Sequence, residues 1–270
     1  MAYFEYQGHR LFYEQLGEGS QTIVLLHGIL MDTDVNRELG KTLAAQGFRI
    51  LLLDLLGHGL SDKPQDVSVL RMDRYADQAI ALLDHLKIQT AVFGGLSLGA
   101  DVSMHAQLRH PTRVQGLMLE MPVLEHAVPG VVILLAPLLL STRLIPGVVR
   151  PISRLIQKLP KRNKLAWDSV RTIFGNDPDA IASVLSGTLV GPIAPTVRER
   201  ESIDVPTLII GHPNDVLHPF TDAEKLSKQI PGAQFVAAES IFELRDRPER
   251  LSGVIASFMK TAWQPKLKVA

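Results

Sequence analysis

Short apolar runs that alternate with helical patterns constrain the fold of this chain more than any other feature. Six runs have the length and composition of buried strands, and they cover residues 22–26, 49–53, 90–93, 116–119, 207–210 and 234–237. Several of them are separated by segments with apolar residues at helical spacing, such as 75–86 and 98–109. Strands and helices that alternate in this way pack as a parallel sheet with helices on both faces. The sequence therefore predicts an α/β fold with a mostly parallel central sheet and flanking helices.

The alternating pattern is preceded by a hairpin signal and interrupted once. Residues 4–16 alternate apolar and polar side chains around Gly8, which predicts a β-hairpin. Between Pro122 and about residue 203, the pattern gives way to helical periodicity with many prolines and glycines. We interpret this stretch as a helical insertion on the carboxyl edge of the sheet. Residues 1–122 and 203–270 then form the core domain, and residues 123–202 form an inserted helical cap.

The composition narrows the class of ligand. With 270 residues and 46% hydrophobic content, the chain is long enough to bury one sizeable core. Lys plus Arg and Asp plus Glu number 28 each, so no net field favours nucleic acid, and a small-molecule substrate fits better. The chain has no cysteine, which excludes a disulfide framework, a thiolate nucleophile and thiolate metal sites. Nothing in the sequence implies a metal or an organic cofactor.

The N-terminal segment and the longest apolar run bear on location. The first residues show no basic region followed by an apolar core, so they do not resemble a signal peptide, and we expect a cytoplasmic location. The run at 128–140 is interrupted by Pro129, Gly130 and Pro137, and it is shorter than the ~20 residues that a membrane span needs. We expect it to be buried or to line a pocket, without stable membrane insertion.

A candidate nucleophile lies in the segment Gly95-Leu96-Ser97-Leu98-Gly99, which follows a predicted strand and precedes a predicted helix. The flanking glycines let the backbone turn sharply enough to expose the Oγ of Ser97 above the sheet. Because Gly and Ser are common residues, the bare pattern also fits a structural turn. The strand-turn-helix context favours a nucleophile elbow.

Two further motifs come earlier in the chain, and both follow predicted strands. The first is Leu26-His27-Gly28-Ile29, and the second begins at Asp54 and reads Asp-Leu-Leu-Gly-His-Gly-Leu-Ser. Together with the elbow at Ser97, they resemble the α/β-hydrolase family, whose members carry a His-Gly oxyanion loop, an Asp-x-x-Gly-x-Gly-x-Ser loop and a Gly-x-Ser-x-Gly elbow in this order. The resemblance covers the core at both ends of the chain. It implies a cap domain inserted after the sixth strand, which agrees with the break at Pro122.

The resemblance also assigns roles to residues. In this family, the amide after the serine, here that of Leu98, and one from the His-Gly loop, here that of Ile29, form the oxyanion hole. The acid of the triad follows the seventh strand, at the position of Asp215. The alternative for Asp215 is a turn aspartate that binds its own backbone. Glu120, at the end of the sixth strand, is a second candidate for the acid.

The family pattern fails at the histidine. A Gly-His pair normally follows the last strand, several residues before a proline, and anchoring on Pro248 places that pair at Ser240 and Ile241. Neither side chain can act as a base near neutral pH. Three explanations remain open: the base comes from elsewhere, the fold has kept a ligand-binding role and lost ordinary hydrolysis, or the histidine of an active enzyme has been replaced.

Several residues could supply the missing base. His218 lies three residues after Asp215 on a loop that should border the site, and the alternative is that it only closes this loop. His126, at the entrance of the insertion, is the second candidate. Glu239 and Glu243 are carboxylates in the loop where the histidine is missing, and we expect both at the surface.

The sequence thus supports a hypothesis of serine hydrolysis. Ser97 would attack a carboxylic ester, thioester or lactone with an apolar portion, the amides of Leu98 and Ile29 would bind the oxyanion, and Asp215 would orient His218. A serine at the elbow argues against the family branches with an aspartate nucleophile, the dehalogenases and epoxide hydrolases. The competing hypothesis is a non-hydrolytic ligand-binding protein on the same fold, supported by Ile241 at the usual histidine position.

Overall fold

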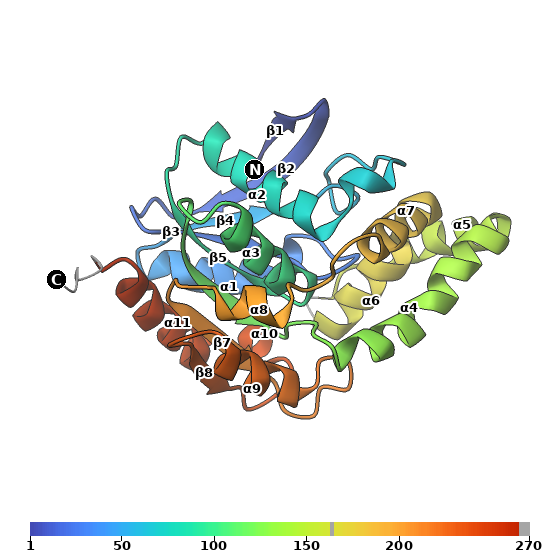
Figure 1. Ribbon diagram of the computed structural model, residues 1–270. Coiled ribbons are helices and arrows are strands. Elements are labelled where there is room, and N and C mark those ends of the chain that lie inside the picture. The colour runs from blue at the N-terminus through green and yellow to red at the C-terminus, as the bar shows by residue number, and fades with distance from the viewer. Residues whose placement is uncertain (163–164, 265–270) are drawn as a thin grey trace.

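A computed structural model describes residues 1–162 and 165–264 of the chain, and its centre is an eight-stranded sheet (Figure 1). The strand order is β1-β2-β4-β3-β5-β6-β7-β8. The pairs β1–β2 and β2–β4 are antiparallel, and all other neighbours are parallel. This arrangement confirms the predicted α/β fold. The strands are β1 (Ala2–Tyr6), β2 (His9–Leu16), β3 (Thr22–Leu26), β4 (Arg49–Leu53), β5 (Ala91–Leu96), β6 (Val114–Glu120), β7 (Thr207–Gly211) and β8 (Gln234–Ala237).

Alternate residues of the parallel strands point to opposite faces of the sheet and build two cores. Val24 and Leu26 of β3 belong to a core that includes residues of α2, α3 and α9, whereas Ile23 and Leu25 belong to a second core with residues of α1 and α11. Burial on both faces explains why these strands are apolar without interruption. The helices of this part are α1 (Asp34–Ala45), the short 3-10 helix η1 (Val67–Val69), α2 (Met72–His85), α3 (Leu98–Arg109), α9 (Phe220–Gln229), α10 (Glu243–Asp246) and α11 (Glu249–Ala262).

The described part of the segment between β6 and β7 is helical, and in Figure 1 its first four helices gather at one side of the sheet. We call these four helices, α4 to α7, the inserted helices. Helix α4 packs against α7, and α5 packs against α6. The helices of this segment are α4 (Ala127–Leu144), α5 (Pro146–Gln157), α6 (Leu165–Gly175), α7 (Pro178–Leu189) and α8 (Val197–Glu201).

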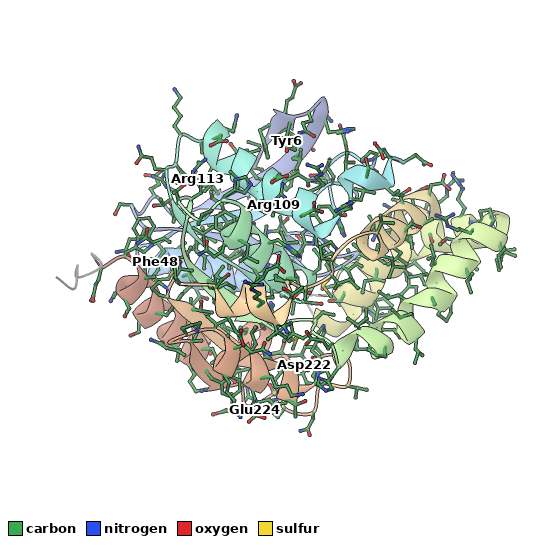
Figure 2. The ribbon with its side chains drawn as sticks, viewed as in Figure 1. Tyr6, Phe48, Arg109, Arg113, Asp222 and Glu224 are labelled. Carbon is green, nitrogen blue, oxygen red and sulfur yellow. The ribbon has the colours of Figure 1, made fainter. Side chains whose placement is uncertain are left out.

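Helix α4 differs from the sequence expectation. The prolines and glycine do not interrupt it, and Pro137 lies inside one continuous helix of 18 residues. The run was expected to be buried or to line a pocket. One side of it lines a cavity, with Val131 and Leu135 in the wall, whereas only Ala127 and Thr142 are buried and Ile133 is 75% exposed. The physical reason is that α4 is apolar all round, whereas only one of its faces meets the rest of the protein. Side chains of α4 and α5 extend outward in Figure 2.

Two glycines let the turn after β5 approach β3 closely. A Cβ added to Gly95 would lie 2.6 Å from the carbonyl oxygen of Leu26, and one added to Gly99 would lie 2.4 Å from the same atom. Both distances are far below van der Waals contact, and the opposing atom belongs to the backbone. Only glycine is therefore compatible with this contact.

The contact predicts an asymmetric effect of two glycine replacements. Gly99→Ala should lower the free energy of unfolding by about 1–3 kcal/mol, because the added methyl group overpacks the β3–α3 contact. The control is Gly130→Ala in exposed α4, where an added Cβ meets no atom within 4 Å. Gly130→Ala should raise stability by about 0.5–1 kcal/mol. Urea unfolding measures both values, and a Gly99→Ala protein as stable as the parent would contradict the packing argument.

Candidate active site

Ser97 occupies the turn between β5 and α3 in a conformation that few serines adopt. Its backbone has φ 55° and ψ −114°, and such a conformation costs roughly 1–3 kcal/mol for a residue with a side chain. The Ser97 amide donates a 2.9 Å hydrogen bond to the carbonyl of Glu120, and the Ser97 carbonyl accepts one of 2.8 Å from Ala100. Strand β6, through Glu120, and helix α3, through Ala100, thus hold the strained turn in place.

The structure brings His218 and Asp215 to Ser97. The Nε2 of His218 lies 2.9 Å from the Oγ of Ser97, and its Nδ1 lies 2.8 Å from the Oδ2 of Asp215. All three side chains come from the carboxyl edge of the sheet, two of them from the loop after β7. Asp215 is also a turn aspartate that binds nearby backbone, the alternative role considered for it, because its Oδ1 accepts hydrogen bonds from the amides of Leu217 and His218. The two roles coexist on separate oxygens.

The electrostatic surroundings keep Asp215 ionised. Burial alone would raise the pKa of Asp215, but the hydrogen bond and charge of His218 and the amides of Leu217 and His218 outweigh it, and its pKa lies below the ordinary value. An ionised Asp215 accepts a hydrogen bond from the Nδ1–H of His218. The Nε2 is then free to accept the hydroxyl hydrogen of Ser97, which is the arrangement that a general base needs.

The two amides expected to bind an oxyanion are available. Within the described part of the chain, neither Leu98 N–H nor Ile29 N–H donates to an acceptor. Leu98 N–H belongs to the first turn of α3, where helical amides have no partner in the helix. Ile29, Ser97 and Leu98 line the same cavity.

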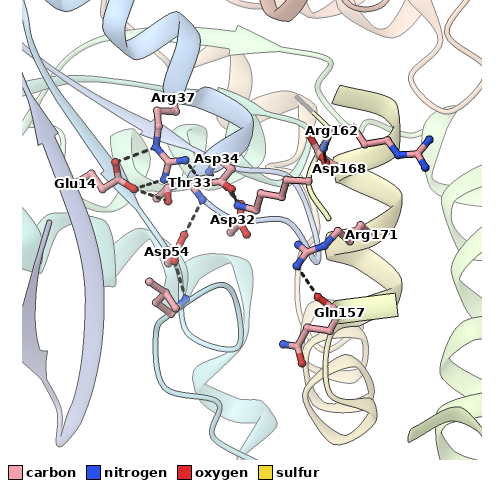
Figure 3. Close-up of polar contacts among 12 residues, drawn as sticks. Glu14, Asp32, Thr33, Asp34, Arg37, Asp54, Gln157, Arg162, Asp168 and Arg171 are labelled. Carbon is pink, nitrogen blue, oxygen red and sulfur yellow. Dashed lines mark hydrogen bonds and ion pairs between the residues drawn. The ribbon is translucent and has the colours of Figure 1, made fainter. Parts of the chain in front are cut away.

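A carboxylate fixes the loop that carries Ile29 (Figure 3). The Oδ1 of Asp54 accepts a 2.7 Å hydrogen bond from the amide of Thr33, and its Oδ2 accepts one of 2.8 Å from the amide of Leu60. His27 adds a second tie, since its Nε2 accepts from the amide of Leu55 at 3.1 Å. The loops after β3 and β4 are therefore held together by side chains of the two motifs.

The cavity beside Ser97 is apolar. It has a volume of about 90 Å³, and among the described residues that line it only Ser97 and Thr188 have polar side chains. Helix α4 contributes much of the wall, including Val131 and Leu135. Among the described residues, no group of three or more His, Cys, Asp and Glu side chains is arranged to hold a metal ion.

The other candidate bases and acids have different partners. His126 places its Nδ1 2.7 Å from the Oδ1 of Asp222, which Figure 2 labels on α9, and its Nε2 lies 3.1 Å from Lys225. Glu120 binds Arg245 through both of its oxygens, at 3.1 and 2.7 Å. Neither side chain forms a hydrogen bond or an ion pair with Ser97 or His218 within the described part of the chain.

The loop after β8 is structural where the family would carry its histidine. Ile241 packs against an apolar cluster that contains Leu96 and Met121. Glu243 was expected at the surface, but it is buried, because it receives two hydrogen bonds from Arg250 at 2.6 and 2.7 Å and one from the amide of Glu239. The bond from Arg250 is the largest cause that lowers the pKa of Glu243.

A buried charge cluster of Glu120, Arg245 and His212 lies at the ends of β6 and β7, and sequence reasoning missed it. The Nε2 of His212 is 3.1 Å from Glu120, and its Nδ1–H donates to the carbonyl of Ser240 at 2.9 Å. Burial would raise the pKa of Glu120, but the charges of Arg245 and His212 lower it to about 2. Burial would lower the pKa of His212, but Glu120 raises it above 6.5. The charged Glu120 at the end of a buried strand was a signal in the sequence. Its partner Arg245 could not be identified from the sequence, because it lies 125 residues away.

Comparisons with known proteins agree with the fold. A family model for the alpha/beta hydrolase fold matches residues 21–239. An uncharacterized protein of Mycobacterium tuberculosis is 29% identical over 275 residues, spanning 94% of this chain and 79% of that protein. A pyrethroid hydrolase of Sphingobium wenxiniae is 28% identical over 253 residues, spanning 87% of this chain and 86% of that protein. Among solved structures, an enol-lactonase from Burkholderia xenovorans has a TM-score of 0.77 at 22% identity, over 96% of this chain and all of that one.

The buried cluster predicts a large cost for neutralising Glu120. Glu120→Gln leaves the charge of Arg245, whose side chain is almost fully buried, without its partner. The free energy of unfolding should therefore fall by about 3–5 kcal/mol near neutral pH. Glu239→Gln in the neighbouring loop is the control, and it should change stability by less than about 0.5 kcal/mol because Glu239 is largely exposed.

The same cluster sets the direction in which the free energy of unfolding changes with pH. Since folding lowers the pKa of Glu120 from 4.5 to about 2, its contribution is complete above the unfolded value and is lost as the pH falls toward about 2. Folding raises the pKa of His212, so its contribution is present below 6.5 and is lost as the pH rises through the raised value. Parent and Glu120→Gln should converge in stability in acid, as measured by urea unfolding across pH. A constant difference down to the lowest pH would contradict this assignment.

Proposed function

Because the chain belongs to the α/β-hydrolase fold family, we propose that it is a serine hydrolase acting on a carboxylic ester, thioester or lactone with an apolar portion. The observation that carries the proposal is the alignment of Ser97, His218 and Asp215 by two contacts of 2.9 and 2.8 Å. This alignment supplies a base for the serine although the usual histidine position is Ile241. A relative named as a pyrethroid hydrolase and a structural neighbour named as an enol-lactonase support the same class of reaction.

The first half of the reaction is acyl transfer to the serine. The Oγ of Ser97 attacks the carbonyl carbon while its proton passes to the Nε2 of His218. The carbonyl oxygen becomes an oxyanion that accepts hydrogen bonds from the amides of Leu98 and Ile29. Such donors are worth about 3–4 kcal/mol each, because they bind charge that develops only in the transition state.

The second half returns the enzyme to its starting state. The bond to the alcohol or thiol breaks, and that group leaves with the proton from the Nε2 of His218. A water molecule then gives a proton to the same nitrogen and attacks the acyl carbon. The bond between the acyl carbon and the Oγ of Ser97 breaks, the acid leaves, and Oγ takes the proton back from the Nε2 of His218. Asp215 stays ionised throughout and stabilises the charged imidazole.

The inserted helices give the proposal its substrate preference. We propose that they act as a cap over Ser97, since α4 contributes Val131 and Leu135 to an almost wholly apolar cavity. An apolar acyl or alcohol group would be removed from water there, at roughly 25 cal/mol per Å² of apolar surface. Charged groups find no ion-pairing side chain among the described residues that line this cavity.

The roles of Ser97 and His218 predict two inactive variants. Ser97→Ala should abolish ester turnover, and His218→Ala should lower it roughly 100- to 10,000-fold, the usual contribution of a positioned general base. His126→Ala is the matched control and should keep parental activity. Turnover is measured with a soluble chromogenic ester, and a fluorophosphonate probe should form an adduct at Ser97 that mass spectrometry locates. Labelling of another residue, equal in parent and Ser97→Ala, would sink the nucleophile assignment.

Rebuilding the loop after β8 distinguishes a serine hydrolase from a non-hydrolytic ligand-binding protein. Ser240→Gly with Ile241→His, made in the His218→Ala background, restores the pair of the family and should return part of the rate. An inactive parent that gains turnover only through this replacement would identify a binding protein that has given up its base. Full activity of His218→Ala would instead show that another group serves as the base.

The apolar cavity predicts a dependence on chain length. Esters of medium-chain acids should be turned over with a higher kcat/KM than acetate, by roughly fourfold for each methylene group that becomes fully buried. Leu135→Gln in the cavity wall should reduce this gain more than it reduces acetate turnover. A kcat/KM that falls steadily from acetate upward would exclude an apolar acyl pocket.

A further inference from the structure

Helix α4 exposes an apolar stripe that faces away from the cavity. Ile133, Pro137, Leu140 and Leu144 are exposed, and their spacing of four, three and four residues places them on one side of the helix. Leu144 is 74% exposed at the end of the helix. The same helix lines the cavity beside Ser97 with its other side.

Helix α5 repeats the pattern with the same spacing. Val148, Ile152, Leu155 and the following Leu159 are exposed, and Leu155 is 66% exposed. The turn at Ile145 between the two helices is exposed and apolar too, so the two stripes are continuous along the chain. We call these exposed residues the cap tip. In Figure 1, α4 and α5 lie on the side remote from the C-terminus.

The sequence segment that holds the cap tip carries basic charge only, although Arg150 of α5 pairs with Asp177 and Asp179 of the following segment. Between Glu125 and Asp168 the sequence holds seven Lys and Arg residues and no Asp or Glu, although the whole chain is neutral. Arg154 and Lys158 are exposed and lie beside the stripe of α5, and neither forms an ion pair within the described part of the chain. An apolar stripe flanked by free basic side chains fits an anionic lipid surface.

We propose that the cap tip docks on the surface of an anionic lipid bilayer. The exposed leucines and isoleucines enter the boundary between headgroups and acyl chains, and Arg154 and Lys158 meet anionic headgroups. Docking would leave the sheet in water and bring the wall of the apolar cavity next to the bilayer.

Helix α4 lies on the bilayer rather than across it. By length and composition α4 could span a membrane, since its 18 residues have a mean hydropathy of 1.9. Its length of about 27 Å is slightly less than the ~30 Å of a hydrocarbon core. One side of α4 also packs against α7 and lines the cavity, so lipid cannot surround the helix while the protein stays folded.

Co-sedimentation with vesicles tests the docking. The parent should bind vesicles of phosphatidylcholine with about a third phosphatidylglycerol and bind pure phosphatidylcholine vesicles much more weakly. Arg154→Gln with Lys158→Gln should lower the affinity roughly 30-fold, from about 1 kcal/mol per basic residue at an anionic surface. Lys228→Gln with Lys260→Gln removes the same charge from exposed sites on α9 and α11 and should leave the affinity unchanged.

A second pair of variants tests the apolar part of the contact. Leu144→Ser with Leu155→Ser should lower vesicle affinity roughly 100-fold, because two leucine side chains no longer leave water. Leu60→Ser is the control, since Leu60 is exposed in the loop after β4. Circular dichroism checks that each variant is folded. Ser97→Ala should bind vesicles as the parent does, so the outcome is independent of the proposed hydrolysis.

Three results would overturn the proposal. The first is a parent that does not sediment with anionic vesicles. The second is vesicle binding that both cap-tip pairs leave unchanged. The third is a parent that forms a dimer in sedimentation velocity, loses it on Leu144→Ser with Leu155→Ser, and ignores vesicles, which would make a second copy of this chain the partner of the cap tip.

Discussion

The contact between the Ser97 turn and β3 is the constraint on which the site depends. Gly95 and Gly99 let this turn lie against the carbonyl of Leu26, where Ser97 adopts a positive φ that hydrogen bonds to Glu120 and Ala100 hold. The same strand then continues into the loop of Ile29, which carries the second amide of the candidate oxyanion hole. One backbone contact therefore fixes the direction of the Ser97 side chain and its distance from that loop.

The loop after β8 holds apolar packing and ion pairs at the position where the family pattern places its histidine. Ile241 fills the space near Leu96 with apolar atoms, and Glu243 and Arg250 form a buried pair close by. Glu120, which could have been an acid for a histidine here, is neutralised by Arg245 and His212. The side chains of this region pack together and form ion pairs, whereas the imidazole that contacts Ser97 comes from the loop after β7.

The fold and part of the candidate site could be predicted from the sequence because both depend on local patterns. Uninterrupted apolar strands and the glycines around Ser97 are readable in a few residues. The pairing of Asp215 with His218 is local too, since three residues separate them, but the contact of His218 with Ser97 joins positions 121 residues apart and needed the structure. The exposure of Ile133 and the burial of Glu243 were missed for the same reason: each depends on which distant element covers the side chain. The catalytic roles of Ser97, Asp215 and His218 stay predictions.

The position of Asp215 and His218 on one short turn changes the mechanics of the site. In the family's usual arrangement, acid, base and nucleophile stand on three separate segments, so two distances vary whenever strands shift. Here three residues separate carboxylate and imidazole, so one short turn sets the distance between them. The remaining contact, between His218 and Ser97, joins the ends of β7 and β5, which β6 separates in the middle of a parallel sheet. The outer strand β8 and the loop after it consequently contribute no atom to either contact.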